Sequence, residues 1–304
     1  MCDLTQPQFL DSDTARAHLE ALRWPNGPVC PHCGAEGKGW AIKGKQRPGL
    51  YKCSHYECRK QFSVTVGTLF EGSKVPLNKW LMAVHLVCAS KKGISSHQLH
   101  RMLGVTYKTA WFMSHRIRAA MKEPHDTQLG GGGGTVEVDE TFWGNSKRKG
   151  RDSKKGHGYH HKEKIFTLVE RGGKARSFHV PAVNAKTLKP IMLEQIAQDA
   201  NVCTDEAAQY TLVGREFASH EVVRHGKGEY CRGTMHTNTI EGFFSILKRV
   251  LVGTFHHVGA QHLSRYIGGF HFRYNYRKLS DSERAKAALI GIAGKRLYYR
   301  QPVI

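Results

Sequence analysis

The pattern of apolar and polar positions over residues 238–251 predicts an amphipathic helix. Its apolar positions recur at helical spacing, at Ile240, Phe243, Phe244, Leu247, Val250 and Leu251. Glu241 and Lys248 lie seven residues apart on the polar side, so both project from one face about 10 Å apart along the axis. One interpretation is structural: Asn238 is the N-cap, Glu241 is its capping-box partner and Lys248 is solvated.

The pattern upstream of this helix predicts a mixed α/β domain. Residues 135–143 alternate like a half-buried strand, 165–183 form a hairpin that turns at Gly172-Gly173, and 184–198 form a helix. Residues 200–209 then contain a short strand that ends at Asp205. This order is shared by RNase H-like nucleases, so we expect a mixed sheet flanked by helices.

Residues 76–121 carry helical periodicity throughout. A first helix stops at Gly93, and residues 94–121 then give a helix, a turn at Gly104 and a second helix from near Thr106. The predicted buried positions are Leu99, Leu103, Val105, Ala110 and Met113, and the predicted outward positions are Lys108, Thr109, His115, Arg116 and Arg118. A DNA-binding helix-turn-helix, with Lys108 and Arg116 on DNA, is one interpretation and an ordinary helical hairpin is the other.

These patterns divide the chain into three expected domains. Residues 1–72 carry paired cysteines, 73–129 are helical, and 135–304 hold the α/β pattern and C-terminal helices. The run of five glycines at 130–134 is expected to be a flexible linker between the second and third domains.

The charge of the chain points to nucleic acid. The net charge is +21 and the pI is about 9.8, values that favour a polyanionic partner such as double-stranded DNA. No stretch of about 18 apolar residues predicts a membrane span, and the N-terminal residues do not resemble a secretory signal. We therefore expect a cytoplasmic protein, nucleoid-associated when bound to DNA, whose eight cysteines are reduced.

Four cysteines are spaced as metal ligands. Cys30 and Cys33 form a first pair and Cys53 and Cys58 a second, in the pattern C-x2-C-x19-C-x4-C. Two close pairs of thiolates suit one tetrahedral, structural zinc ion, and the flanking strand-like residues predict a zinc ribbon. His55 is an alternative ligand to either cysteine of the second pair. Lysines and arginines surround the predicted ribbon, and their positive charges suit contact with a DNA phosphate backbone.

Three carboxylates in the third domain are candidate ligands of a hard cation. Asp139, Asp205 and Glu241 follow one another at separations of 66 and 36 residues. Carboxylates brought together bind Mg²⁺ or Mn²⁺, and two such ions support phosphoryl transfer. Taken singly, each of these two acids has an equally good structural explanation: Asp139 as an exposed strand residue and Asp205 as a turn residue.

Neighbouring acids compete with these assignments. Glu206 is adjacent to Asp205, and Glu140 is adjacent to Asp139 but points to the opposite face of a strand. Glu137 shares the face of Asp139 and is the stronger rival.

Further basic segments are candidates for DNA contact. Lys147, Arg148 and Lys149 lie in a basic loop after the first predicted strand, and Lys248 and Arg249 lie on the helix of Glu241. The histidine pairs 160–161 and 256–257 are better explained as surface or DNA-facing residues than as metal ligands.

Several of these blocks resemble the DDE-class transposases of bacterial insertion sequences, and more narrowly the ISXO-like group. The resemblance is carried by "VEVDET", "CTDE", "HTNTIEGFFSILKR", "GTFHHV" and "FRYN", together with the cysteine pairs and "FSVTVGTLFEGSKVPLNKW". It covers nearly the whole chain. Gly268-Gly269 depart from the group, in which an acidic residue is expected before Phe270.

The resemblance implies a function for the candidate residues. Asp139, Asp205 and Glu241 match the metal-binding triad, and Lys248 matches a lysine that holds a DNA phosphate near the scissile bond. The implied activity is Mg²⁺-dependent cleavage and joining of DNA strands, after the ribbon and helix-turn-helix bind the element's terminal inverted repeats. Synapsis of two DNA ends implies at least a homodimer. The alternatives are a non-catalytic zinc-ribbon DNA-binding protein and an RNase H-like nuclease without strand joining.

Overall fold

The chain forms two compact units. The computed structural model describes residues 4–42, 48–144, 162–229, 231–295 and 297. Residues 1–123 and 276–304 make up the first unit, and residues 124–275 make up the second.

Helices form most of the first unit. They are α1 (Pro7–Leu10), α2 (Ser12–Arg23), α3 (Leu77–Ala89), α4 (Ser96–Leu103), α5 (Tyr107–Ala120) and α9 (Asp281–Ile290). The central helix is α3, whose residues 80–88 are buried at every position except Met82, because α1, α2, α4, α5 and α9 pack around it. Among the described residues, none of the helices is long and apolar enough to cross a membrane.

The two helices predicted on either side of Gly104 are present. Gly104 ends α4 in the left-handed conformation, with φ of 59°, which favours glycine. The Thr106 side chain then caps α5 by accepting a hydrogen bond from the Thr109 amide at 3.2 Å. The tight turn between α4 and α5 therefore follows directly from local sequence.

A small antiparallel sheet in the order β1-β2-β3 also belongs to the first unit. Its strands are β1 (Gly39–Ala41), β2 (Tyr51–Cys53) and β3 (Gln61–Phe62). The Trp24 ring, at the end of α2, meets Tyr51 and Phe62 edge-on, with centroids 5.5 and 5.8 Å away. These rings form the apolar support of an otherwise small element.

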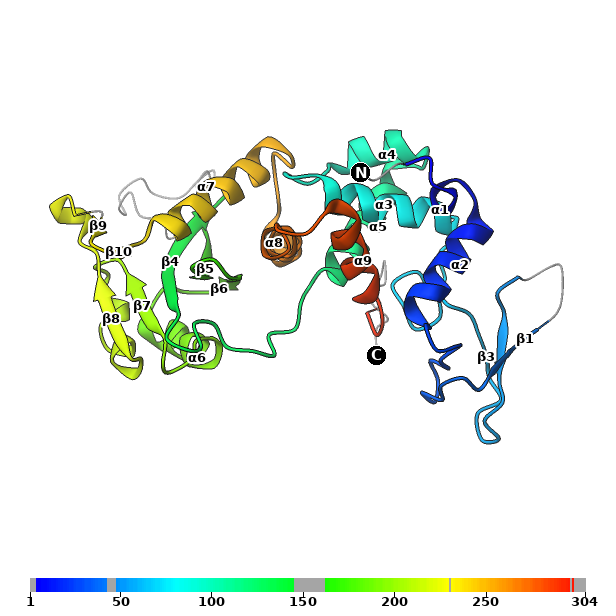
Figure 1. The fold of residues 1–304 in the computed structure, drawn as a ribbon. Coiled ribbons are helices and arrows are strands. Elements are labelled where there is room, and N and C mark those ends of the chain that lie inside the picture. Colours follow the sequence, from blue (N-terminus) through cyan, green and yellow to red (C-terminus); the bar gives the residue numbers. More distant parts are fainter. Residues whose placement is uncertain (1–3, 43–47, 145–161, 230, 296, 298–304) are drawn as a thin grey trace. The chain divides into compact units, whose positions relative to one another are not determined.

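The second unit is built on a five-stranded sheet in the order β6-β5-β4-β7-β8. Its strands are β4 (Thr135–Trp143), β5 (Glu163–Glu170), β6 (Ala175–Val180), β7 (Asn201–Thr204) and β8 (Ser219–Val222). Strands β4, β5 and β6 are antiparallel neighbours, whereas β7 and β8 run parallel to β4. The predicted RNase H-like arrangement, a mixed sheet flanked by helices, is confirmed (Figure 1).

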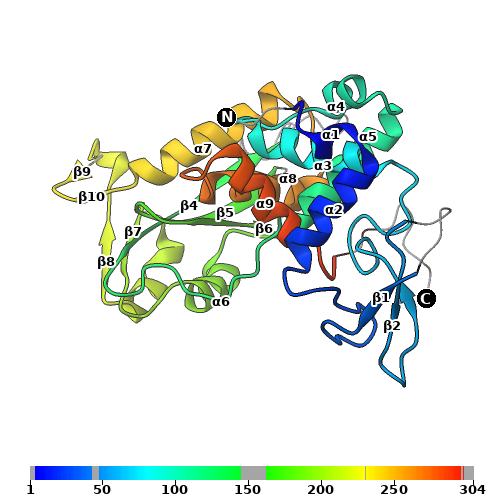
Figure 2. The same ribbon diagram turned by 45° about the vertical axis from the view of Figure 1, so that its right-hand side comes forward.

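Helices cover both faces of this sheet (Figure 2). On one face α6 (Ala185–Gln195) packs through Leu188 and Met192 against Val136 and Val138 of β4. On the other face lie α7 (Asn238–Gly253) and α8 (Ala260–Asn275). The buried side chains of α7 are the six apolar positions expected from the sequence: Ile240, Phe243, Phe244, Leu247, Val250 and Leu251.

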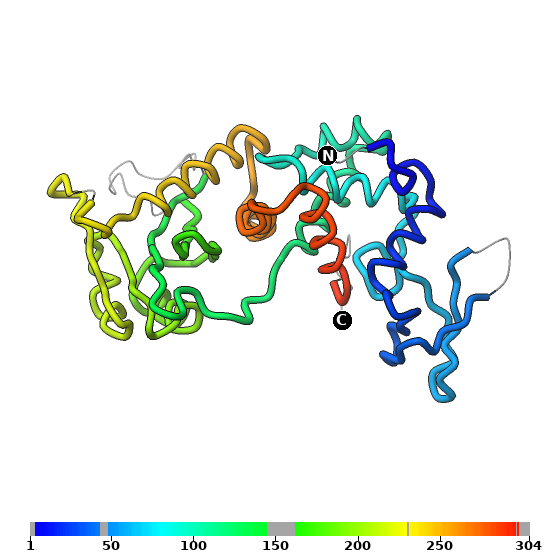
Figure 3. Tube along the Cα trace, in the orientation of Figure 1, coloured from blue at the N-terminus to red at the C-terminus, as the bar shows by residue number. Residues whose placement is uncertain are grey.

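The division of the chain differs from the expected one at two places. The glycine run at 130–134 is a turn inside the second unit, where the Gly130 amide donates to Glu170 Oε1 at 2.9 Å and the Gly132 amide to Asp199 Oδ2 at 2.8 Å. At the other end, α9 packs on α3 and so leaves the expected 135–304 domain for the first unit, as the red and cyan segments of Figure 3 show.

Candidate active site

The sheet places Asp205 beside Asp139. Strands β4 and β7 are parallel, with Glu137 opposite Cys203. The pairing ends there, and Asp205, two residues after Cys203, lies near enough to Asp139 for its charge to raise the Asp139 pKa. Asp205 directly follows β7, and its Oδ1 accepts a hydrogen bond from the Ala207 amide at 3.1 Å.

Glu137 attaches the helix that carries Glu241 to the same strand. Its Oε2 accepts from the Ile240 amide at 2.9 Å, and its Oε1 accepts from Thr239 Oγ1 at 2.8 Å. A carboxylate at this position satisfies a free amide of the first turn of α7 and favours the positive end of the helix dipole. Glu241, also in the first turn, is thereby fixed to the strand that bears Asp139.

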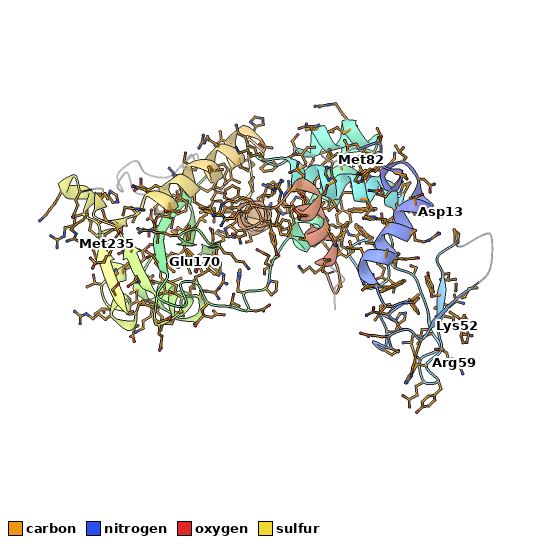
Figure 4. All side chains as sticks on the ribbon, in the orientation of Figure 1. Asp13, Lys52, Arg59, Met82, Glu170 and Met235 are labelled. Carbon is orange, nitrogen blue, oxygen red and sulfur yellow. The ribbon has the colours of Figure 1, made fainter. Side chains whose placement is uncertain are left out.

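Arg171 completes this anchor. Its Nε donates to Glu137 Oε1 at 2.6 Å, and its Nη atoms donate to the carbonyls of Thr234 and His236 at 2.6 and 2.8 Å. Arg171 lies in the β5–β6 turn. The carbonyls that accept its hydrogen bonds lie in the hairpin of β9 (Cys231–Arg232) and β10 (Met235–His236). Figure 4 labels Met235 in that hairpin and Glu170 at the end of β5. One ion pair, fully buried at Glu137 and partly exposed at Arg171, thus joins β4, the β5–β6 turn and the start of α7.

These contacts decide between Glu137 and Asp139 as a candidate ligand. Glu137 is fully buried, and its two oxygens accept three hydrogen bonds from Thr239, Ile240 and Arg171 in addition to a contact with His236 Nδ1 at 3.3 Å. Its acceptor capacity is used within the protein, whereas Asp139 accepts one amide hydrogen bond, from Glu140, at 2.7 Å. The geometry therefore favours Asp139.

The capping-box interpretation of α7 is wrong. The helix begins at Asn238, and the N-cap residue Thr237 makes no side-chain capping bond. Glu241 Oε1 instead accepts from Thr237 Oγ1 at 3.2 Å and lies 3.6 Å from His225 Nε2. Glu241 is 49 % exposed at its side chain, so its carboxylate remains open to solvent.

The acids interact electrostatically. The pKa of Asp139 is raised to about 7, chiefly by burial. The negative charges of Glu140, Asp205 and Glu241 act in the same direction, against the lowering effect of the Glu140 amide. Several acidic groups therefore lie close enough to Asp139 to influence its ionisation.

Glu140 lies on the opposite face of β4, as strand alternation predicts. It accepts hydrogen bonds from Tyr210 Oη and from Gln209 Nε2, the latter at 3.2 Å. Burial raises the pKa of Glu140, and burial next to Glu140 raises the pKa of Tyr210. Glu140 thus contributes charge to the site from behind the sheet.

The basic candidates have different environments. Lys248 and Arg249 are exposed on the same side of α7 as Glu241, and Arg249 donates to Ser245 O and Oγ at 3.2 Å each. Lys147, Arg148 and Lys149, and the histidine pair 160–161, lie outside the described residues. Lys108 is exposed on the first turn of α5.

Three predicted outward side chains of α5 are instead buried. His115, Arg116 and Arg118 are 0, 5 and 3 % exposed. Arg116 lies over the rings of Trp80 and Phe112, and its Nη2 donates to the Glu71 carbonyl at 3.0 Å. The prediction that Arg116 faces outward from this helix is therefore wrong.

The four cysteines form a closed cluster. The sulfurs of Cys30 and Cys58 lie 3.8 Å apart, those of Cys33 and Cys53 lie 3.7 Å apart, and all four lie within 4.8 Å of one another. In the described part of the chain this is the one such group; the carboxylates of Asp139, Asp205 and Glu241 are more widely spaced. His55 is outside the cluster.

Local turns build the cysteine cluster. The Gly34 amide donates to the Cys30 carbonyl at 2.9 Å, and the Cys58 amide donates to the His55 carbonyl at 3.0 Å. Four converging sulfurs suit tetrahedral Zn²⁺. Lys52 and Arg59, labelled in Figure 4, belong to this ribbon.

Sequence reasoning missed Arg171 and His225. Both act over a long sequence separation, since Arg171 contacts Glu137 and His225 contacts the first turn of α7. Neither belongs to a local motif. The one sequence signal was Glu137 within a strand, because an acid that becomes buried there needs a cationic partner.

A zinc ribbon and an RNase H-like sheet that carries an acid within β4 and another directly after β7 define a two-part architecture. Comparison with protein families identifies both parts: residues 10–61 match a transposase zinc-ribbon domain and residues 130–275 match an ISXO2-like transposase domain. The chain therefore belongs to the ISXO2-like insertion-sequence transposases.

A protein in transposable element ISH50 of Halobacterium salinarum, itself uncharacterized, is similar along almost the whole chain. It is 29 % identical over 297 residues, which cover 92 % of this chain and 97 % of the relative. The relative extends the similarity to the helices that the two family models leave unmatched.

Proposed function

We propose that this protein is a divalent-metal-dependent DDE transposase that cuts DNA at the ends of its element and joins the ends to target DNA. Asp139, Asp205 and Glu241 are the proposed catalytic triad. One observation carries the proposal: three carboxylates from three separate elements lie close enough that the charges of Asp205 and Glu241 add to the effect of burial, which raises the pKa of Asp139 to about 7.

The acids fit a hard cation. Their oxygen ligands suit Mg²⁺ or Mn²⁺, and a bound cation would relieve the repulsion that raises the Asp139 pKa. When two ions are bound, they would activate an attacking oxygen and stabilise the leaving oxygen of an in-line displacement.

The protein's own residues position the reactants. Glu137 and Arg171 hold the first turn of α7 against β4, so Glu241 lies near enough to Asp139 for its charge to act on the Asp139 pKa. Lys248, about two turns further along the exposed side of α7, is placed to hold a DNA phosphate. Water is the first nucleophile and the freed 3′-hydroxyl the second, without a covalent protein–DNA intermediate.

The first unit is the proposed binder of terminal inverted repeats. Its zinc ribbon carries basic residues, and Lys108 is exposed at the start of α5. Two DNA ends must meet for joining, so we expect at least a homodimer on DNA, acting in the cytoplasm.

The test is strand cleavage and joining on labelled duplex DNA that carries the repeats flanking the gene. The full-length, zinc-loaded protein is compared with Glu241→Gln and with the matched control Glu216→Gln, in Mg²⁺, Mn²⁺ or EDTA. Glu216 is an exposed acid of the same unit, and its carboxylate pairs at 2.7 Å with Lys189 of α6, on the face of the sheet opposite α7.

Metal-dependent nicking and joining that Glu241→Gln abolishes and Glu216→Gln retains is the expected result. Cleavage without joining would indicate a nuclease. DNA binding without cleavage by the wild-type protein would indicate a non-catalytic zinc-ribbon DNA-binding protein.

A further inference from the structure

A cavity of about 390 Å³ lies in the first unit, between α5 and the loop that precedes α3. Three of its lining side chains are cationic (Lys74, Lys108 and Arg116) and two are aromatic (Trp80 and Phe112). Among the residues that the structure describes, no carboxylate lines it. A cavity of this charge and of ligand-binding size selects for an anion.

The guanidinium of Arg116 is held rigidly in this cavity. Its carbon lies 5.5 Å from the ring centroid of Trp80 and 5.4 Å from that of Phe112, and its Nη2 donates to the Glu71 carbonyl at 3.0 Å. An arginine stays protonated at all working pH values, and its planar fork matches phosphate oxygens. The cavity thus has a fixed, permanently charged wall.

Lys74 and Lys108 are exposed lining residues, and both backbones are fixed. The Oγ of Ser73 accepts hydrogen bonds from Trp80 Nε1 at 2.8 Å and from the Val75 amide at 3.1 Å, which holds the loop on either side of Lys74. Lys108, Phe112 and Arg116 follow at intervals of four residues on α5 and therefore share one face of that helix.

The cavity suits a phosphate better than a stacked base. The Trp80 ring is 1 % exposed because Arg116 and Phe70 cover it, with the Phe70 centroid at 5.2 Å. A nucleobase needs an open aromatic face, whereas a phosphodiester needs only converging donors.

We propose that this cavity binds a single backbone phosphate of duplex DNA, held between the ammonium groups of Lys74 and Lys108 with Arg116 behind them. This inference rests on the proposed transposase function and specifies how its first unit contacts DNA. Such a contact fixes the position of α5 on the duplex and carries no sequence information itself.

The experiment measures binding of the full-length, zinc-loaded protein to fluorescent duplexes over a range of salt. Wild type is compared with Lys74→Ala/Lys108→Ala and with Lys91→Ala, an exposed lysine of the same unit that does not line the cavity. A duplex with the gene's flanking repeat and an unrelated duplex are both used. Neutral methylphosphonate linkages, introduced one at a time, then locate the phosphate.

The double variant is expected to bind both duplexes roughly three- to tenfold more weakly and to reduce the slope of log K against log salt by about 1. One methylphosphonate should weaken wild-type binding and leave the double variant unaffected. Lys91→Ala should match wild type in all three respects.

Three results would overturn the inference. The first is equal DNA binding by the double variant and Lys91→Ala, the second is a loss confined to the flanking-repeat duplex, and the third is binding of inorganic phosphate to the cavity at matched ionic strength without any effect of the variants on DNA binding. If cleavage and joining persist in the first case, the phosphate cavity fails while the proposed transposase function stands.

Discussion

The cysteine cluster and the carboxylate site are both candidate metal centres, but they are built in opposite ways. The four cysteine sulfurs already lie within 4.8 Å of one another, drawn together by two tight turns from a single small sheet. The carboxylates come from the middle of β4, the residue after β7 and the first turn of α7, and they are more widely spaced. Burial, together with the charges of neighbouring acids, raises the Asp139 pKa to about 7. Local turns thus preform a closed structural site, whereas long-range contacts assemble an open one that a substrate can enter.

This difference also separates what each metal does. A closed set of four sulfurs leaves no ligand position for a substrate and contributes mainly to folding. An oxygen site with an exposed member such as Glu241 can exchange water and DNA oxygens. The two centres should therefore fail independently when either is damaged.

The largest expected effect follows zinc removal. Chelation, or Cys53→Ser, should unfold the ribbon, because structural zinc contributes roughly 10–16 kcal/mol in small zinc domains. Limited proteolysis should then cleave within residues 28–62 while a fragment containing residues 124–275 persists. Loss of Mn²⁺ binding at the carboxylates in the same sample would contradict the independence of the two centres.

A smaller but still large effect is expected for Glu137→Gln. Removing the charge of an ion-pair member buried as completely as Glu137 costs about 3–5 kcal/mol. The glutamine also replaces one of the two acceptor oxygens by a donor, which faces either the Ile240 amide or Arg171 and Thr239. Urea unfolding should show this loss, with Glu163→Gln as a control because its pair with His179 is more exposed. Equal stability of the two variants would mean that the Glu137–Arg171 anchor is unimportant.

The pH dependence of metal binding is the next largest effect. Since the folded pKa of Asp139 is about 7, a proton competes with the cation below that pH. Affinity for Mn²⁺ should rise about tenfold from pH 6 to pH 8 and level off above, as measured by calorimetry.

The same raised pKa affects stability with the opposite sign. A buried carboxyl with a raised pKa stabilises the folded state only while it is protonated, so the metal-free protein should lose stability as the pH rises from about 4 through 7. Asp139→Asn should remove this loss while it abolishes Mn²⁺ binding. A metal affinity that does not change between pH 6 and pH 8 would contradict the assignment.

The smallest expected effect is that of Lys248→Ala. Losing one phosphate contact should weaken DNA binding by roughly three- to tenfold and lower the salt slope by about 1, without changing Mn²⁺ affinity. Lys189→Ala, on α6 at the other face of the sheet, is the matched control. Anisotropy titrations that show the same loss in both variants would remove Lys248 from the site.

The sequence predicted β4 to β7, α6 and α7 because their signals are local, whereas it did not predict β8, β9 and β10. The six apolar positions of α7 are buried as its periodicity indicates, and β4 alternates Val138 and Asp139 between opposite faces. The paired cysteine spacing predicted the closed cluster for the same reason. Each prediction depends on residues only a few positions apart.

The failures come from contacts between distant residues. Asn238 has a side chain that commonly caps helices. The Ile240 amide at the start of α7 instead donates its hydrogen bond to Glu137, 103 residues earlier in the sequence. Arg116 follows a helical pattern that leaves it outward, but α5 packs against both α3 and α9, so more of its surface is buried than one neighbour would cover. Helix periodicity also does not indicate which unit a helix packs in. The expected third domain therefore included α9, which lies in the first unit.

The most direct test of the carboxylate site is Mn²⁺ binding followed by electron paramagnetic resonance in the zinc-loaded protein. Wild type would be compared at pH 8 with Asp139→Asn, Asp205→Asn, Glu241→Gln and the control Glu216→Gln. If the three acids form one site, each triad variant loses bound Mn²⁺ and the control retains it. Retention of wild-type binding by any two triad variants would show that these carboxylates do not act together.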